Sequence, residues 1–151
     1  MEYGVHTSFI ELAGEVNTVM PNWVISKVEQ ALNYRCKAVN GSRILIISVA
    51  YKKDTKDTRE SPGLEIYASL DKRGAIVSYH DLFVSALRET RQYALAGMSI
   101  SLDSKNIANQ DCVVICTDHS NVEHEVTRDN ARLIVDTLGV FDAGGSAIVF
   151  A

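Results

Sequence analysis

Residues 43–50 read Arg-Ile-Leu-Ile-Ile-Ser-Val-Ala, an almost continuous apolar run that follows the turn signal Asn40-Gly41. A run of this length without polar alternation is typical of a strand buried on both faces of a parallel sheet. Two further apolar runs, at residues 111–117 and 132–136, have the same character. The sequence therefore predicts a sheet whose central strands are parallel and covered on both sides.

Outward from these runs, segments with helical spacing alternate with shorter apolar stretches. We expect helices at residues 62–73, 85–96, 104–109 and 122–130, and further strands at 75–79, 98–102 and 147–150. Strands that alternate with helices at this spacing imply right-handed crossovers in an open parallel sheet. The expected fold class is α/β, with a Rossmann-like open parallel sheet, helices on both faces and a long N-terminal helix in front.

The N-terminal segment carries an apolar stripe at steps of three and four. Its members are Phe9, Leu12, Ala13, Val16, Val19, Met20, Trp23, Val24, Val28, Ala31 and Leu32. The stripe keeps its phase across Pro21, which predicts one helix that is kinked or briefly interrupted there. A helix from residue 9 to residue 32 would be about 36 Å long, too long for a small domain to cover. We expect it to mediate self-association as a symmetric dimer; the alternative is that it packs wholly on its own sheet.

Composition excludes several classes of protein. The 151 residues carry 15 Lys and Arg against 19 Asp and Glu, a net charge of −4, which argues against nucleic-acid and membrane-surface binding. We expect no membrane span and no secretory signal, because no long uncharged apolar run and no basic N-terminal segment occur. Three cysteines are an odd, low number, typical of a cytoplasmic protein without disulfides.

Ligands of such a sheet bind beyond the carboxyl ends of its strands, so the loop after the first strand is of interest. It has neither a Gly-x-Gly-x-x-Gly fingerprint nor a Walker pattern, and no dinucleotide site is expected there. Ser61 and Pro62 predict a capped helix N-terminus, which favours an anion such as phosphate. Tyr51 could add a flat surface for a base or sugar. The loop carries four cations (Lys52, Lys53, Lys56, Arg59) and three carboxylates (Asp54, Asp57, Glu60), and the alternative is that these simply pair in solvent.

Residues 116–124 offer a possible metal or acid–base site. Cys116, Asp118, His119 and His124 match no common closed zinc pattern, so we expect no metal, and we expect all three cysteines to be buried small hydrophobes. A histidine at a strand end can act as a general acid or base, but more often caps a loop or serves as a hydrogen-bond partner. No catalytic residue is predicted in this chain.

Several motifs resemble those of one enzyme family. The segment Phe-Ile-Glu-Leu-Ala-Gly-Glu-Val-Asn at residues 9–17, with Met20-Pro21, is similar to the central helix of the UDP-glucose/GDP-mannose dehydrogenases. Residues 49–54 and 57–62, Val-Ala-Tyr-Lys-Lys-Asp and Asp-Thr-Arg-Glu-Ser-Pro, resemble the C-terminal signature of that family. Motifs at residues 79–81, 114–119 and 134–137 follow in the family's order. The sequence of these motifs is most similar to the branch of the family that acts on UDP-N-acetyl-hexosamines.

The resemblance implies a division of labour. Such enzymes have an NAD-binding domain, a central dimerisation domain and a C-terminal domain for the UDP part of the substrate, and oxidise the sugar C6 alcohol to a carboxylate in two NAD-linked steps with a catalytic cysteine. Residues 1–38 would be the end of the central helix and residues 39–151 the UDP-sugar-binding domain. The Gly-Gly-His-Cys-type catalytic motif and the glycine fingerprint are both missing, so we expect this chain to bind no NAD and to be inactive alone.

Position by position, Tyr51 and Lys52 match the family's aromatic–lysine pair that contacts the nucleotide sugar. Arg59 matches the arginine of the Thr-Arg-Glu-Ser motif, and we expect it to order the loop or to support the phosphates. Leu138 stands where the family usually has an arginine that helps to hold UDP, and Ser48 replaces a usual glycine. The alternative function is therefore a non-catalytic interaction module that kept the fold but lost the nucleotide.

Overall fold

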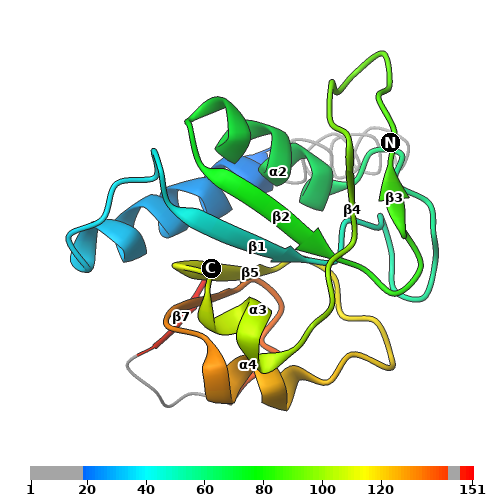
Figure 1. Ribbon diagram of the computed structural model, residues 1–151. Helices are drawn as coiled ribbons and strands as arrows, with labels where there is room; N and C mark the ends of the chain where they lie inside the picture. The colour runs from blue at the N-terminus through cyan, green and yellow to red at the C-terminus, as the bar shows by residue number, and fades with distance from the viewer. Residues whose placement is uncertain (1–18, 143–146) are drawn as a thin grey trace, which may run out of the picture.

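A five-stranded parallel sheet forms the centre of the molecule in the computed structural model, which describes residues 19–142 and 147–151 (Figure 1). The strand order is β2-β1-β5-β6-β7, and each neighbouring pair is parallel. The strands are β1 (Arg43–Ile47), β2 (Ile76–His80), β5 (Cys112–Ile115), β6 (Ile134–Asp136) and β7 (Ile148–Phe150). The predicted α/β class is confirmed, and these strands end within a few residues of their predicted bounds.

Helices cover both faces of the sheet, as predicted (Figure 1). The N-terminal helix, which is described from residue 19 to residue 34, and α2 (Pro62–Lys72) lie on one face. On the other face are α3 (Ser104–Ala108) and α4 (His124–Asn130). Residues of β1 alternate between the two sides: Ile44 and Ile46 pack with the first pair of helices, Leu45 and Ile47 with the second. This alternation is the period of two that a strand imposes.

The N-terminal helix buries one side against its own sheet. Val24, Ile25, Val28 and Leu32 are almost fully buried in the core that also contains β1 and α2. Pro21 lies inside the helix, near the beginning of its described part. The predicted first half of the apolar stripe, with residues 9–17, lies outside the described residues, and the division at residue 38 stays a prediction.

The start of α2 is fitted tightly onto the end of β1. The Ser61 hydroxyl accepts the Leu64 N–H at 3.3 Å and donates to the Val49 carbonyl at 2.6 Å, and Pro62 occupies the first turn. A Cβ atom on Gly63 would lie 2.8 Å from the Ser48 carbonyl oxygen, so glycine permits the close approach. The predicted cap is confirmed, and it sets the distance between the helix N-terminus and the strand.

The predicted helix at residues 85–96 is wrong. The segment forms β3 (Ala86–Leu87) and β4 (Gly97–Met98), a two-stranded antiparallel sheet with a long excursion between them. Only Met98 of the predicted strand 98–102 lies in a strand. The buried side chains Val84, Leu87 and Leu95 have a spacing that fits one face of a helix, but Arg88 and Arg91, at intervening positions of that face, are exposed. The three buried side chains fold the excursion back onto the core. A turn closes it, in which Thr90 and Tyr93 exchange hydrogen bonds.

Within the described part of the chain, no helix is both long and apolar enough to cross a bilayer.

Candidate functional site

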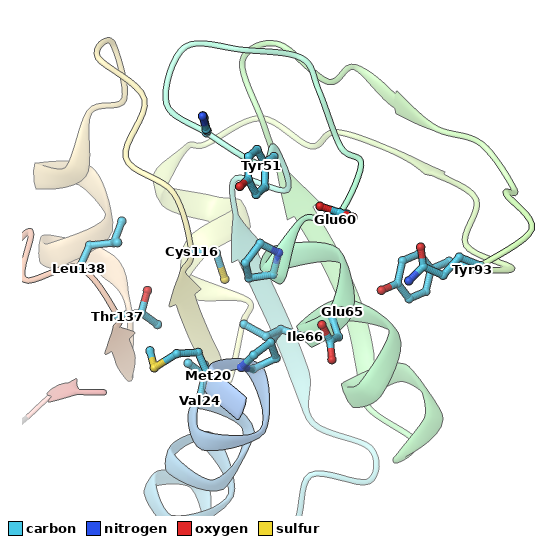
Figure 2. Close-up of a pocket in the computed structure, with 14 residues that line it drawn as sticks. Met20, Val24, Tyr51, Glu60, Glu65, Ile66, Tyr93, Cys116, Thr137 and Leu138 are labelled. Atoms are coloured by element: carbon cyan, nitrogen blue, oxygen red, sulfur yellow. The ribbon is translucent and has the colours of Figure 1, made fainter. Parts of the chain in front are cut away.

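A crevice of about 730 Å³ lies at the carboxyl ends of the sheet, beside the N-terminus of α2 (Figure 2). Six segments between residues 20 and 138 contribute its walls. They are the N-terminal helix (Met20, Pro21, Val24), the loop after β1 (Tyr51, Lys52, Glu60), α2 (Pro62, Glu65, Ile66), the β3–β4 excursion (Gln92, Tyr93) and the ends of β5 and β6 (Cys116, Thr137, Leu138). This is the place at which open parallel sheets bind ligands.

Tyr51 and Lys52, two of the predicted binding residues, lie together in this crevice. The Lys52 Nζ atom is 5.3 Å from the centroid of the Tyr51 ring, which is 44% exposed. The Tyr51 N–H donates to the Asp57 carbonyl at 2.6 Å, and this bond closes the loop behind them. A flat aromatic surface and an exposed ammonium group are thus side by side, an arrangement that suits a base or sugar next to a phosphate.

Arg59, the third predicted residue, is not part of the crevice lining. Its guanidinium donates to both carboxylate oxygens of Asp57, at 3.1 and 3.0 Å, and its side chain is 88% exposed. These hydrogen bonds lower the pKa of Asp57 to about 2. Arg59 therefore braces the loop through its hydrogen bonds to Asp57.

Asp81 holds the loop from beneath, and sequence reasoning gave it no role. Its buried carboxylate accepts the N–H groups of Val49 and Ala50 at 2.9 and 3.2 Å. The other oxygen accepts the N–H groups of Phe83 and Val84 at 2.8 and 3.1 Å. One side chain therefore fixes the ends of β1 and β2 together. The sequence feature that could have indicated this role is its position directly after a strand, where backbone N–H groups at the strand ends need an acceptor.

His119 extends this support and is fully buried. Its Nδ1 accepts the Asp54 N–H at 2.8 Å, which leaves the proton on Nε2, 3.2 Å from the Asp81 carboxylate. Asp54 in turn accepts the Ser120 N–H and hydroxyl, hydrogen bonds that lower the pKa of Asp54. His119 is thus a hydrogen-bond partner that joins the loops after β1 and β5, and it does not line the crevice.

Cys116 faces the crevice as a neutral thiol, because burial raises its pKa to about 12. Cys112 is buried, with its pKa raised to about 12 by burial. Cys36 is exposed, which corrects the prediction that all three cysteines are buried: it follows the N-terminal helix in a turn with φ of 57°. Among the described residues, no cluster of His, Cys, Asp or Glu could hold a metal ion.

Leu138 lies at the crevice edge, opposite α2, and is 50% exposed (Figure 2). Asp136 positions it, because its buried carboxylate accepts the N–H groups of Leu138, Gly139 and Phe141 at 2.9 to 3.0 Å. The backbone turn that would carry the family's arginine is therefore present, but it presents an apolar side chain to the crevice.

The connection from β1 to α2 does not fit NAD. A dinucleotide site needs a tight glycine turn that brings the pyrophosphate onto the helix N-terminus. Here the ten residues from Tyr51 to Glu60 intervene, and Ser61 already accepts the Leu64 N–H.

Comparisons with known proteins agree with this geometry. Residues 45–143 match the UDP-glucose/GDP-mannose dehydrogenase family, UDP binding domain. The chain is 26% identical over 145 residues to the UDP-N-acetyl-D-mannosamine dehydrogenase of Methanococcus vannielii, covering 91% of this chain and 31% of that protein. It is 27% identical over 137 residues to the NDP-N-acetyl-D-galactosaminuronic acid dehydrogenase of Ralstonia nicotianae, covering 89% of this chain and 30% of that protein.

A solved structure shares the fold. The crystal structure of the NDP-N-acetyl-D-galactosaminuronic acid dehydrogenase from Methanosarcina mazei Go1 matches with a TM-score of 0.71 and 25% identity, over 93% of this chain and 30% of that one. The chain thus spans about three tenths of the length of these relatives. Their names support the predicted N-acetyl-hexosamine branch. From the matched domain, the shared fold and the crevice at the expected edge of the sheet, it follows that the chain belongs to the UDP-glucose/GDP-mannose dehydrogenase family.

Proposed function

We propose that the crevice binds the UDP part of a nucleotide sugar. The observation that carries the proposal is the pairing of Tyr51 and Lys52 at the carboxyl end of β1, inside the crevice and beside the N-terminus of α2. The Tyr51 ring stacks on the base or a sugar, and the Lys52 ammonium binds the diphosphate. Arg59 contributes indirectly, because its bonds to Asp57 brace the loop that carries both residues.

The larger reaction is the oxidation of a UDP-N-acetyl-hexosamine, or a related UDP-sugar, at its C6 alcohol to the carboxylate. In this proposal the chain supplies the UDP-sugar-binding portion of an NAD-dependent dehydrogenase in the cytoplasm, while NAD and the catalytic cysteine belong to other parts of the enzyme. The names of the relatives support this substrate class, and the poor fit of the β1–α2 connection to NAD supports the division.

Self-association through the N-terminal helix is part of the proposal. Val24 and Val28 bury one side of the helix, whereas Val19 and Trp23 on its other side are 60% and 50% exposed. Exposed apolar side chains in one patch favour a second protein surface. A second copy of the chain is the simplest partner, since two-fold dimers are the commonest closed assemblies.

Calorimetric titration with UDP tests the binding function directly. Lys52→Ala is expected to weaken UDP binding by about 1.5 to 3 kcal/mol, the range for a hydrogen bond to a charged group, or roughly ten- to a hundredfold. Lys53→Ala is the matched control, because Lys53 is exposed on the same loop and does not line the crevice. Equal affinity of Lys52→Ala and the unaltered chain would refute the assignment of Lys52.

Leu138 favours a second candidate, a non-catalytic interaction module. The crevice lining contains one cation, Lys52, and two carboxylates, Glu60 and Glu65, so it holds no surplus of positive charge among the described residues. If the unaltered chain binds neither UDP nor a UDP-sugar at millimolar ligand, the UDP-binding proposal is refuted and this second candidate is the one that remains.

A further inference from the structure

The side of the crevice away from Leu138 has a distinct chemistry. Figure 2 shows Glu60, Glu65 and Tyr93 on one side, and Cys116, Thr137 and Leu138 on the other. Gln92 from the β3–β4 excursion also lines the crevice. Glu65 lies on the first turn of α2, so this side is built by α2 and by the β3–β4 excursion.

The side chains of Glu65, Gln92 and Tyr93 make no hydrogen bond to any other residue in the described ranges 19–142 and 147–151. Glu65 and Tyr93 are nevertheless near one another, since burial first, and the charge of Glu65 second, raise the pKa of Tyr93. Both side chains are only partly exposed. A carboxylate, an amide and a phenol therefore line a common space, and the described part of the chain leaves their hydrogen-bonding capacity unused.

This set of groups suits a neutral ring that carries hydroxyl groups. A carboxylate accepts two hydroxyl protons, a phenol donates or accepts one bond, and a carboxamide does both. A phosphate is disfavoured here because it would meet the Glu60 and Glu65 carboxylates, whereas Lys52 attracts it elsewhere in the crevice. The charges thus determine the orientation of a bound ligand, with its phosphates at Lys52 and an uncharged part near Glu60 and Glu65.

We infer that Glu65, Gln92 and Tyr93 form a binding site for a hydroxyl-bearing, uncharged ring of the ligand whose diphosphate lies at Lys52. The inference rests on the proposed function and adds the orientation of the ligand: its ring lies against α2 and the β3–β4 excursion. Two rings of a UDP-sugar have this chemistry, the ribose and the hexose. The excursion is then a specificity element, since it carries two of the three side chains.

Titration calorimetry with UDP and with UDP-N-acetylglucosamine tests the site. Glu65→Gln, Gln92→Ala and Tyr93→Phe are each expected to weaken binding of UDP-N-acetylglucosamine by about three- to tenfold, the effect of one or two lost hydrogen bonds. If UDP binding is unchanged in these variants, the site holds the hexose. If UDP binding falls by the same factor, the site holds the ribose.

Matched controls remove the same groups outside the crevice. Glu89→Gln takes a charge from the same excursion, and Tyr34→Phe takes a phenol from a side chain that is 94% exposed; both should bind as the unaltered chain does. Thermal unfolding of each variant confirms that it is folded. Full affinity for both ligands in all three crevice variants would overturn the inference while leaving the proposed function intact. An unaltered chain that binds neither ligand would overturn both.

Discussion

Ser48 is a residue in an unfavourable backbone conformation. It directly follows β1 with φ of 72°, a region that favours glycine, and its buried hydroxyl has no hydrogen-bond partner among the described residues. The left-handed conformation costs a non-glycine residue about 1–2 kcal/mol, and an unsatisfied buried hydroxyl costs about 1–3 kcal/mol. The glycine usual at this position in the family therefore has a backbone reason.

Ser48→Gly is expected to raise the free energy of unfolding by about 1 kcal/mol, since the gain exceeds the added entropy of glycine in the unfolded chain. Urea unfolding measures the change. Ser42→Gly is the control: the Ser42 hydroxyl donates to the Ala38 carbonyl at 2.5 Å, so this variant should lose stability. A Ser48→Gly chain less stable than the original would contradict the account.

At the scale of elements, one carboxylate ties the N-terminal helix to the sheet. Asp111 accepts Lys37 Nζ at 2.8 Å, just beyond the helix, and the Arg43 N–H at 2.9 Å, at the start of β1. Burial alone would raise the pKa of Asp111, but these hydrogen bonds outweigh it and hold that pKa below its ordinary value of 3.8. Asp111 therefore stabilises the fold above pH 4, and this contribution is lost as the pH falls through the lowered pKa.

Asp111→Asn is expected to reduce the free energy of unfolding at pH 7 by about 1.5 to 3 kcal/mol, the range for hydrogen bonds to a charged group. Below pH 4 the difference from the original chain should shrink, because the carboxylate becomes protonated there. Urea unfolding at pH 7 and pH 3 measures both effects. Asp129→Asn, in the exposed Arg128–Asp129 pair, should change stability little at either pH. A constant difference at the two pH values would show that the charge of Asp111 is not responsible.

Across the whole molecule, the uncovered side of the N-terminal helix predicts association. Light scattering at high micromolar concentration should give the mass of a dimer, and the double variant Val19→Asp with Trp23→Asp should give that of a monomer. Tyr34→Asp, at an exposed site near the end of the same helix, should remain dimeric. A monomer mass for the original chain would show that the helix is not an interface.

The fold could be read from the sequence where burial dictates composition. The apolar runs of β1, β5 and β6 are buried on both faces. Because ligands bind at the carboxyl ends of such strands, the loop after β1, with Tyr51 and Lys52, could be predicted as part of the site. The β3–β4 excursion could not be predicted, because the spacing of Val84, Leu87 and Leu95 also fits a helix, and their burial is set by tertiary packing. For the same reason Gln92 and Tyr93 were missed. Arg59 was expected to order the loop or to support the phosphates, and the sequence alone could not show that its guanidinium donates to the Asp57 carboxylate two residues away.

The walls of the crevice come from residues 20 to 138, so the crevice exists only when nearly the whole chain is folded. A ligand that fills it would bind the native state and not the unfolded chain, and would therefore stabilise the fold. At a hundred times its dissociation constant, such a ligand adds about 2.7 kcal/mol to the free energy of unfolding. The shift in melting temperature at a fixed ligand concentration therefore ranks nucleotide sugars by affinity, because a ligand that binds more tightly stabilises the native state more.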